Sequence, residues 1–79
     1  MSIKVGQIYK VNEDYTSDNC IFVITRTQNE DAYLVSNIGY AKERDKILLE
    51  NDIKDKYIKL IAEYPTWQEA VNSEYFKND

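Results

Sequence analysis

Lys42, Arg44 and Lys46 alternate along the chain, and their spacing is the clearest candidate for binding chemistry in the sequence. Alternate residues of a β-strand share one face, so the three cations would form one basic surface. Basic side chains beside aromatic ones, here Tyr33 or Tyr40, are how small barrels hold single-stranded nucleic acid. Two acidic residues alternate with them, however, and the chain carries a net charge of −4. We therefore favour a charged edge strand that resists aggregation.

Catalytic chemistry is limited by the residue types that the chain lacks. It contains no His, one Cys and two Gly. Without His, the usual general base, the Ser-His and Cys-His nucleophile pairs and the commonest transition-metal ligand are all missing. One Cys cannot build an ordinary zinc site, and two Gly cannot supply a phosphate-binding loop. Cys20 begins an apolar run with no base beside it, which is typical of a small core residue. We expect no catalytic residue, metal site or cofactor.

Two pairs of adjacent carboxylates remain as candidates for acid–base or calcium chemistry: Glu13 with Asp14, and Glu30 with Asp31. Both pairs fall in predicted loops, and successive residues of an extended chain point in opposite directions. The alternate-ligand spacing of a calcium loop is also missing. The sequence therefore predicts solvated turns at both places.

Size and composition predict one small folded domain over residues 1–79. A chain of 79 residues that is 43% hydrophobic is too apolar to be disordered, but its core must be thin. No apolar run approaches the roughly 20 residues that span a bilayer, and the first residues do not resemble a signal peptide. The single Cys fits a reducing compartment. We expect a soluble, cytoplasmic protein with no membrane contact.

Apolar–polar alternation and β-branched residues predict three strands in the first half of the chain. The strongest is the nearly continuous apolar run at 20–27, which indicates a central, buried strand. Polar residues with turn propensity separate the strands, and Gly39 is suited to positive φ in one turn. The predicted strands are 5–11, 20–27 and 32–36, and the predicted loops and turns are 12–19, 28–31 and 37–39.

Residues 40–64 allow two interpretations. Leu49, Ile53 and Tyr57 begin a stripe with the spacing of an amphipathic helix. The alternative is a strand over 42–49, a short turn or single helical turn at 51–55 and a last strand over 57–63. Asn and Asp compete for backbone hydrogen bonds inside helices, and several would lie within one long helix. We therefore predict mainly strand, with a turn around 51–55.

The end of the chain predicts a helix over residues 67–76. Pro65 disfavours helix at the residue before it, so a new element begins afterwards. Thr66 and Glu69 have the spacing of a capping box. Trp67 then lies near the start of the helix. We expect its indole to be buried against the sheet, because so small a domain has little other core. The alternative is an interface with a partner or a second copy, formed by Trp67, Val71 and Tyr75.

Two stretches resemble known proteins. Residues 5–9 (VGQIY) and 51–61 (NDIKDKYIKLI) resemble the outline of an SH3-like barrel, in which a short turn precedes the last strand. Residues 64–73 (YPTWQEAVNS) look like the tail of small uncharacterised phage and prophage proteins of low-GC Gram-positive bacteria. The resemblance implies a mainly β fold with a C-terminal helix: a small barrel of about five strands over 3–64, then the helix. The alternative is an α+β fold, with a three-stranded antiparallel sheet, a long helix over 42–64 and a short C-terminal helix.

The leading functional hypothesis is a non-catalytic protein-interaction protein, of phage or prophage origin by resemblance. Its partner would be another protein or a second copy in a homodimer. One alternative is a nucleic-acid-associated module that uses Lys42, Arg44 and Lys46. Another is an acidic inhibitor that imitates nucleic acid. Because the charges are mixed and the chain is acidic, we expect weak binding or none to random single-stranded nucleic acid at physiological salt.

Overall fold

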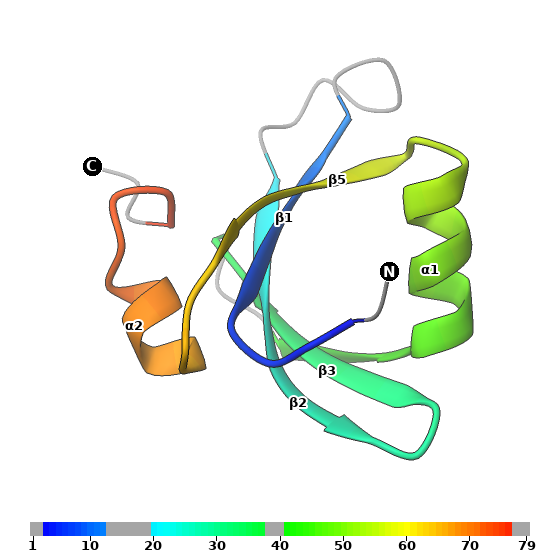
Figure 1. Cartoon of the computed structure of the whole chain (residues 1–79), viewed down its shortest axis with the longest axis horizontal. Helices are drawn as coiled ribbons and strands as arrows, with labels where there is room; N and C mark the ends of the chain where they lie inside the picture. The colour runs from blue at the N-terminus through cyan, green and yellow to red at the C-terminus, as the bar shows by residue number, and fades with distance from the viewer. Residues whose placement is uncertain (1–2, 13–19, 38–40, 77–79) are drawn as a thin grey trace.

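Five strands and two short helices make up the part of the chain that the computed structural model describes, residues 3–12, 20–37 and 41–76 (Figure 1). The strands form one open antiparallel sheet in the order β4-β3-β2-β1-β5. The first and last strands along the chain, β1 and β5, are therefore neighbours in the sheet. The prediction of a mainly β fold with a C-terminal helix is confirmed. Along the chain the elements are β1 (Gln7–Val11), β2 (Ile21–Gln28), β3 (Asp31–Ser36), β4 (Ala41–Asp45), α1 (Lys46–Lys54), β5 (Ile58–Glu63) and α2 (Trp67–Val71).

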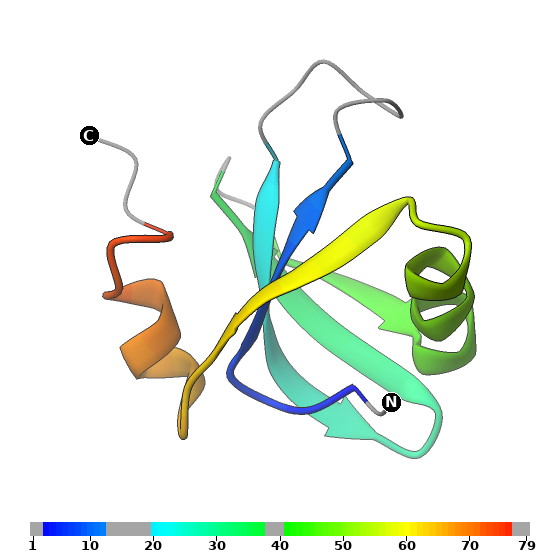
Figure 2. The same ribbon diagram turned by 45° about the horizontal axis from the view of Figure 1, so that its top comes forward.

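The core is divided into two clusters, one on each face of the sheet, because successive strand residues point to opposite sides. Helix α1 covers one face through Leu49, and α2 covers the other through Ala70. Figures 1 and 2 show the two helices on opposite sides of the sheet. The buried residues of the first cluster are Ile3, Tyr9, Phe22, Ile24, Ala32, Leu34, Leu49 and Ile58, and those of the second are Ile8, Val23 and Ala70.

The strands of the first half agree with the alternation in the sequence. Strands β1, β2 and β3 match the predicted strands 5–11, 20–27 and 32–36 with ends that differ by one or two residues. The predicted turn at 28–31 is confirmed, and Asn29 adopts a φ of 55° there. Most of the predicted loop 12–19, and Gly39 of the predicted turn 37–39, lie outside the described residues.

Residues 40–64 follow the order of the second interpretation, a strand, a helical element and a last strand, but the helix is longer than predicted. The expected strand over 42–49 ends at Asp45, and α1 replaces its second half and most of the turn predicted at 51–55. The Asp45 carboxylate accepts a hydrogen bond from the Ile47 N–H at 2.8 Å and caps the new helix. The long helix over 42–64 and the three-stranded sheet are also wrong, because β4 and β5 flank α1. The predicted last strand is confirmed as β5.

A partly buried polar network joins β1 to the end of β5. The Gln7 side-chain oxygen accepts hydrogen bonds from the Tyr9 hydroxyl at 2.6 Å and from the Lys4 N–H at 2.8 Å. The Gln7 amide nitrogen donates to a Glu63 carboxylate oxygen at 2.9 Å. Burial raises the pKa of Tyr9 to about 12, and the negative charges of Glu63 and Glu50 contribute in the same direction. The neutral phenol is therefore the form that the fold stabilises.

The raised pKa of Tyr9 predicts a loss of stability in strong base. An unfolded tyrosine ionises near its ordinary value of 10.0, whereas the folded one ionises at about 12. The unfolded state therefore loses its proton first, and the free energy of unfolding falls as pH rises from 10 towards 12. We expect Tyr9 to account for a loss of about 2 kcal/mol between pH 9 and pH 11.5.

Urea denaturation of the parent and of Tyr9→Phe at the two pH values measures this contribution. The variant should be less stable by about 1 kcal/mol at pH 9, because it lacks the hydrogen bond to Gln7. Its further loss at pH 11.5 should be smaller than that of the parent by about 2 kcal/mol. Equal pH dependence in the two proteins would show that Tyr9 does not titrate with a raised pKa.

Candidate protein-interaction surface

Helix α2 begins where the sequence predicts. Thr66 has extended backbone angles, φ −135° and ψ 155°, and its hydroxyl oxygen accepts a hydrogen bond from the Glu69 N–H at 3.2 Å. This contact satisfies one of the free N–H groups of the first turn. The predicted N-cap and the start of the helix at Trp67 are therefore confirmed.

The helix is shorter than the predicted 67–76, because it ends at Val71. Two polar side chains turn back onto carbonyl groups of the last turn. The Asn72 amide donates to the Gln68 carbonyl at 3.0 Å, and the Ser73 hydroxyl donates to the Ala70 carbonyl at 2.6 Å. Such local bonds compete with continuation of a helix. Residues 72–76 follow as turns, so Tyr75 is not on the helix.

The side of α2 that contacts the sheet is formed by small and aliphatic residues, and the Trp is not among them. Ala70 is completely buried beside Ile8 and Val23, and Val71 packs against the same cluster. Within the described residues Trp67 belongs to neither core cluster, and 36% of its surface is exposed. The prediction that the indole fills the core is wrong. The small side chain of Ala70 lets the helix approach the sheet, and Phe76 adds aromatic packing there.

This segment carries aromatic and acidic side chains that are exposed to solvent. Tyr75 is 44% exposed, and Trp67 is the other large aromatic exposed here. Glu69 and Glu74 are exposed as well, and residues 60–76 contain no Lys or Arg. We call Trp67, Glu69, Glu74 and Tyr75 the aromatic–acidic segment. The predicted interface of Trp67, Val71 and Tyr75 is thus divided, since Val71 packs against the core while the two aromatics remain partly exposed.

The proposed basic surface is interrupted by the start of α1. Lys42 and Arg44 occupy alternate positions of β4, opposite Leu34 and Ala32 in the register. Lys46 is the first residue of α1, so the three cations do not share one strand face. The Arg44 guanidinium forms an ion pair with the Asp52 carboxylate at 3.1 Å. This pair reduces the cationic charge that β4 offers to a phosphate backbone.

The remaining candidates for chemistry do not combine into a site. Cys20 is half-buried just before β2 and forms no disulfide. Glu30 lies in the turn between β2 and β3, where it is exposed, and Glu13 with Asp14 lies outside the described residues. Over 3–12, 20–37 and 41–76, no group of three or more metal-ligating side chains gathers. Nor does any helix in these ranges have the length and apolar character needed to cross a bilayer.

Two features were missed by sequence reasoning. Ile47 and Leu48 are exposed at the start of α1, although as strand residues one of them would have faced the core. A pocket also opens between α1 and β5, and it includes Lys56. The positive φ of Lys56, 67°, has no signal in the sequence, because Gly or Asn is the usual residue at such a position.

Comparisons with models of protein families, with curated proteins and with solved structures gave no match. The fold and the surface themselves define a small antiparallel β-sheet domain that carries solvent-exposed aromatic residues on an acidic C-terminal segment.

Proposed function

We propose that the protein is a non-catalytic interaction domain that binds another protein through its aromatic–acidic segment. The observation that carries this proposal is the exposure of Trp67 and Tyr75 on a segment that Ala70 anchors to the sheet. Trp and Tyr are enriched among the residues that dominate binding energies. Trp67 is held at the capped start of α2, which reduces the ordering entropy that binding would cost.

The charge of the segment defines the chemistry of its partner. With Glu69 and Glu74 exposed and no Lys or Arg over 60–76, the segment complements an apolar pocket rimmed by Lys or Arg. Cationic side chains also interact favourably with the face of an indole ring. A second copy would bring like charges together, so self-association through this segment is disfavoured.

The SH3-like barrel is the architecture that we propose for this domain. Two features support it: β1 pairs with β5, which is the last strand along the chain, and helix α1 precedes that strand. In the strand order of the sheet, β4 and β5 are the two edges, and the proposed barrel brings these edges towards each other.

Replacing both exposed aromatics should abolish partner binding and leave the fold intact. The test is quantitative capture from a bacterial lysate by the immobilised parent and by Trp67→Ala/Tyr75→Ala. Proteins that the parent retains should be depleted about tenfold or more by the double variant, because such anchors dominate interface energies. The same proteins should be released when the salt concentration rises, since the complementary charges are screened.

Tyr57→Ala is the matched control, because Tyr57 is 44% exposed, as Tyr75 is, but follows α1 on the other side of the sheet. It should retain the same proteins as the parent. Circular dichroism must show that the double variant is folded. If the folded double variant captures the same proteins in the same amounts, the interaction surface lies elsewhere. Sedimentation that shows a dimer lost in the double variant would instead identify the segment as a contact between two copies.

A further inference from the structure

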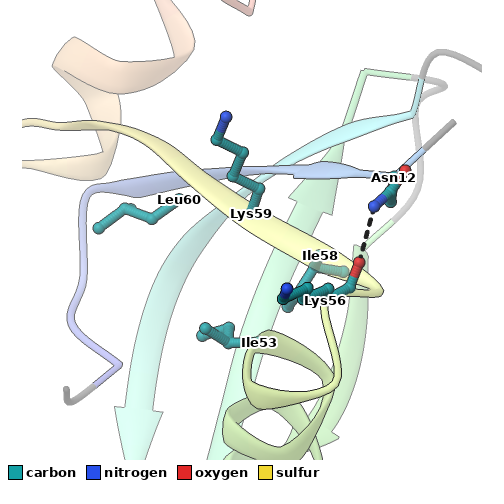
Figure 3. Close-up of a pocket in the computed structure, with 6 residues that line it drawn as sticks. All are labelled: Asn12, Ile53, Lys56, Ile58, Lys59 and Leu60. Carbon is teal, nitrogen blue, oxygen red and sulfur yellow. Dashed lines mark hydrogen bonds between the residues drawn. The ribbon is translucent and has the colours of Figure 1, made fainter.

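A pocket of about 430 Å³ opens between α1, β5 and the end of β1 (Figure 3). This volume lies within the roughly 300–1,000 Å³ of small-molecule sites. It is on the opposite side of the sheet from α2 and is therefore separate from the aromatic–acidic segment. The lining residues are Asn12, Ile53, Lys56, Ile58, Lys59 and Leu60.

The apolar wall of the pocket follows from the register of β5 on β1. Ile58 is paired with Val11, and Leu60 with Tyr9, so both residues of β5 point to the face that α1 covers. Ile53 of α1 completes this wall, and Figure 3 shows Ile53 and Ile58 on the same side of the β5 ribbon. An apolar ligand would therefore contact three aliphatic side chains.

Lys56 is the charged residue directed to this wall, and its backbone is held in an unusual conformation. Its φ of 67° is in the left-handed region, where a Lys is strained and a Gly is not. The Asn12 side-chain amide donates to the Lys56 carbonyl at 2.9 Å, and the Lys56 N–H donates to the Ile53 carbonyl at 3.1 Å. In Figure 3 the Lys56 side chain runs beneath β5 towards Ile58 and Ile53. Strained residues of this kind often mark binding sites.

The charge around the pocket is positive although the whole chain is acidic. Residues 54–59 contain three Lys and one Asp. Lys56 forms no ion pair within the described ranges of the chain. Lys59 lies between Ile58 and Leu60 on β5 and is paired with Lys10. Because side chains alternate along a strand, the Lys59 side chain points to the face of the sheet opposite to that of Ile58 and Leu60, as Figure 3 shows. One cation, Lys56, is thus directed to an apolar wall.

We propose that this pocket binds a small aliphatic carboxylate. The hydrocarbon chain lies along Ile53, Ile58 and Leu60, and the carboxylate accepts a hydrogen bond from the Lys56 ammonium. Charge-assisted bonds of this type are stronger than neutral ones, so the head group determines which amphiphile binds. The matching alcohol lacks the charge, and the matching amine would be repelled by Lys56.

The test titrates the full chain with octanoate, 1-octanol and octylamine, and follows the backbone amides by two-dimensional NMR. Octanoate should shift the amides of Asn12, Ile53 and residues 56–60, with a Kd of about 1 mM or lower. Octanol should bind about tenfold more weakly, and octylamine should bind more weakly still. Shifts confined to other parts of the chain, or equal affinity for octanol and octanoate, would overturn the proposal.

Lys56→Gly separates binding from folding, and Lys54→Gln is its control, because Lys54 is exposed and is not among the residues that line the pocket. Gly adopts a positive φ without strain, so Lys56→Gly should raise the melting temperature by about 4 °C. It should nevertheless weaken octanoate binding about tenfold, whereas Lys54→Gln should leave the Kd within about twofold of the parent. Undiminished binding by folded Lys56→Gly, or equal losses in the two variants, would show that the Lys56 ammonium does not hold the carboxylate.

Discussion

Gly6→Ala is expected to lower the free energy of unfolding by about 2–4 kcal/mol, although it adds only one methyl group. Gly6 has a φ of 90°, which an L-residue with a side chain adopts only under strain. A Cβ at this position would lie 2.1 Å from the Tyr64 carbonyl oxygen. That atom belongs to the backbone, so no rotamer change can relieve the clash.

The reason for this sensitivity is that Gly6 joins strands that are distant in sequence. Its N–H donates to the Ile24 carbonyl at 2.9 Å, and its carbonyl accepts from the Tyr64 N–H at 3.0 Å. Moving the chain away from Tyr64 would weaken the contact between the start of β1 and the end of β5. Urea denaturation measures the loss, and Val5→Ala, at a neighbour that is 37% exposed, should change stability by less than about 1 kcal/mol. A Gly6→Ala protein as stable as Val5→Ala would show that the chain relaxes freely here.

Features that depend on nearby residues were predictable from the sequence. The alternation of apolar residues identified β1, β2 and β3, because side chains alternate between the two faces of a strand. The start of α2 was also predictable, since Thr66 supplies its cap three residues before Glu69. In each case the deciding interaction lies within a few residues of the pattern.

Features that depend on contacts across the fold were not predictable. The pattern of residues after Asp45 fits a strand and a helix almost equally well. The helix α1 is favoured because it buries Leu49 against one face of the sheet. Local pattern also could not show that Ala70, rather than Trp67, meets the sheet. The pocket requires the register of β5 on β1 and the left-handed backbone of Lys56, and neither is marked in the sequence.

Leu49→Ala should lower the free energy of unfolding by about 2–5 kcal/mol, whereas Leu48→Ala should change it by about 0.5 kcal/mol or less. The two residues are chemically identical neighbours on α1, but Leu49 is fully buried and Leu48 is 55% exposed. A strand at 42–49 would also place them on opposite faces, so this pair alone does not distinguish helix from strand.

Ile53 supplies that distinction, because it lies one helical turn after Leu49 and packs, partly buried, against the same cluster. If α1 forms as described, Ile53→Ala should cost about 1–2 kcal/mol, between the values for the two Leu variants. Urea denaturation of the three variants gives the comparison, provided that the slope of unfolding free energy against urea concentration is the same in all three.

A domain of this size has only about 4–12 kcal/mol of stability, so Leu49→Ala should bring it close to unfolding. If Leu49→Ala and Leu48→Ala were equally mild, α1 would not be the element that closes this face of the sheet.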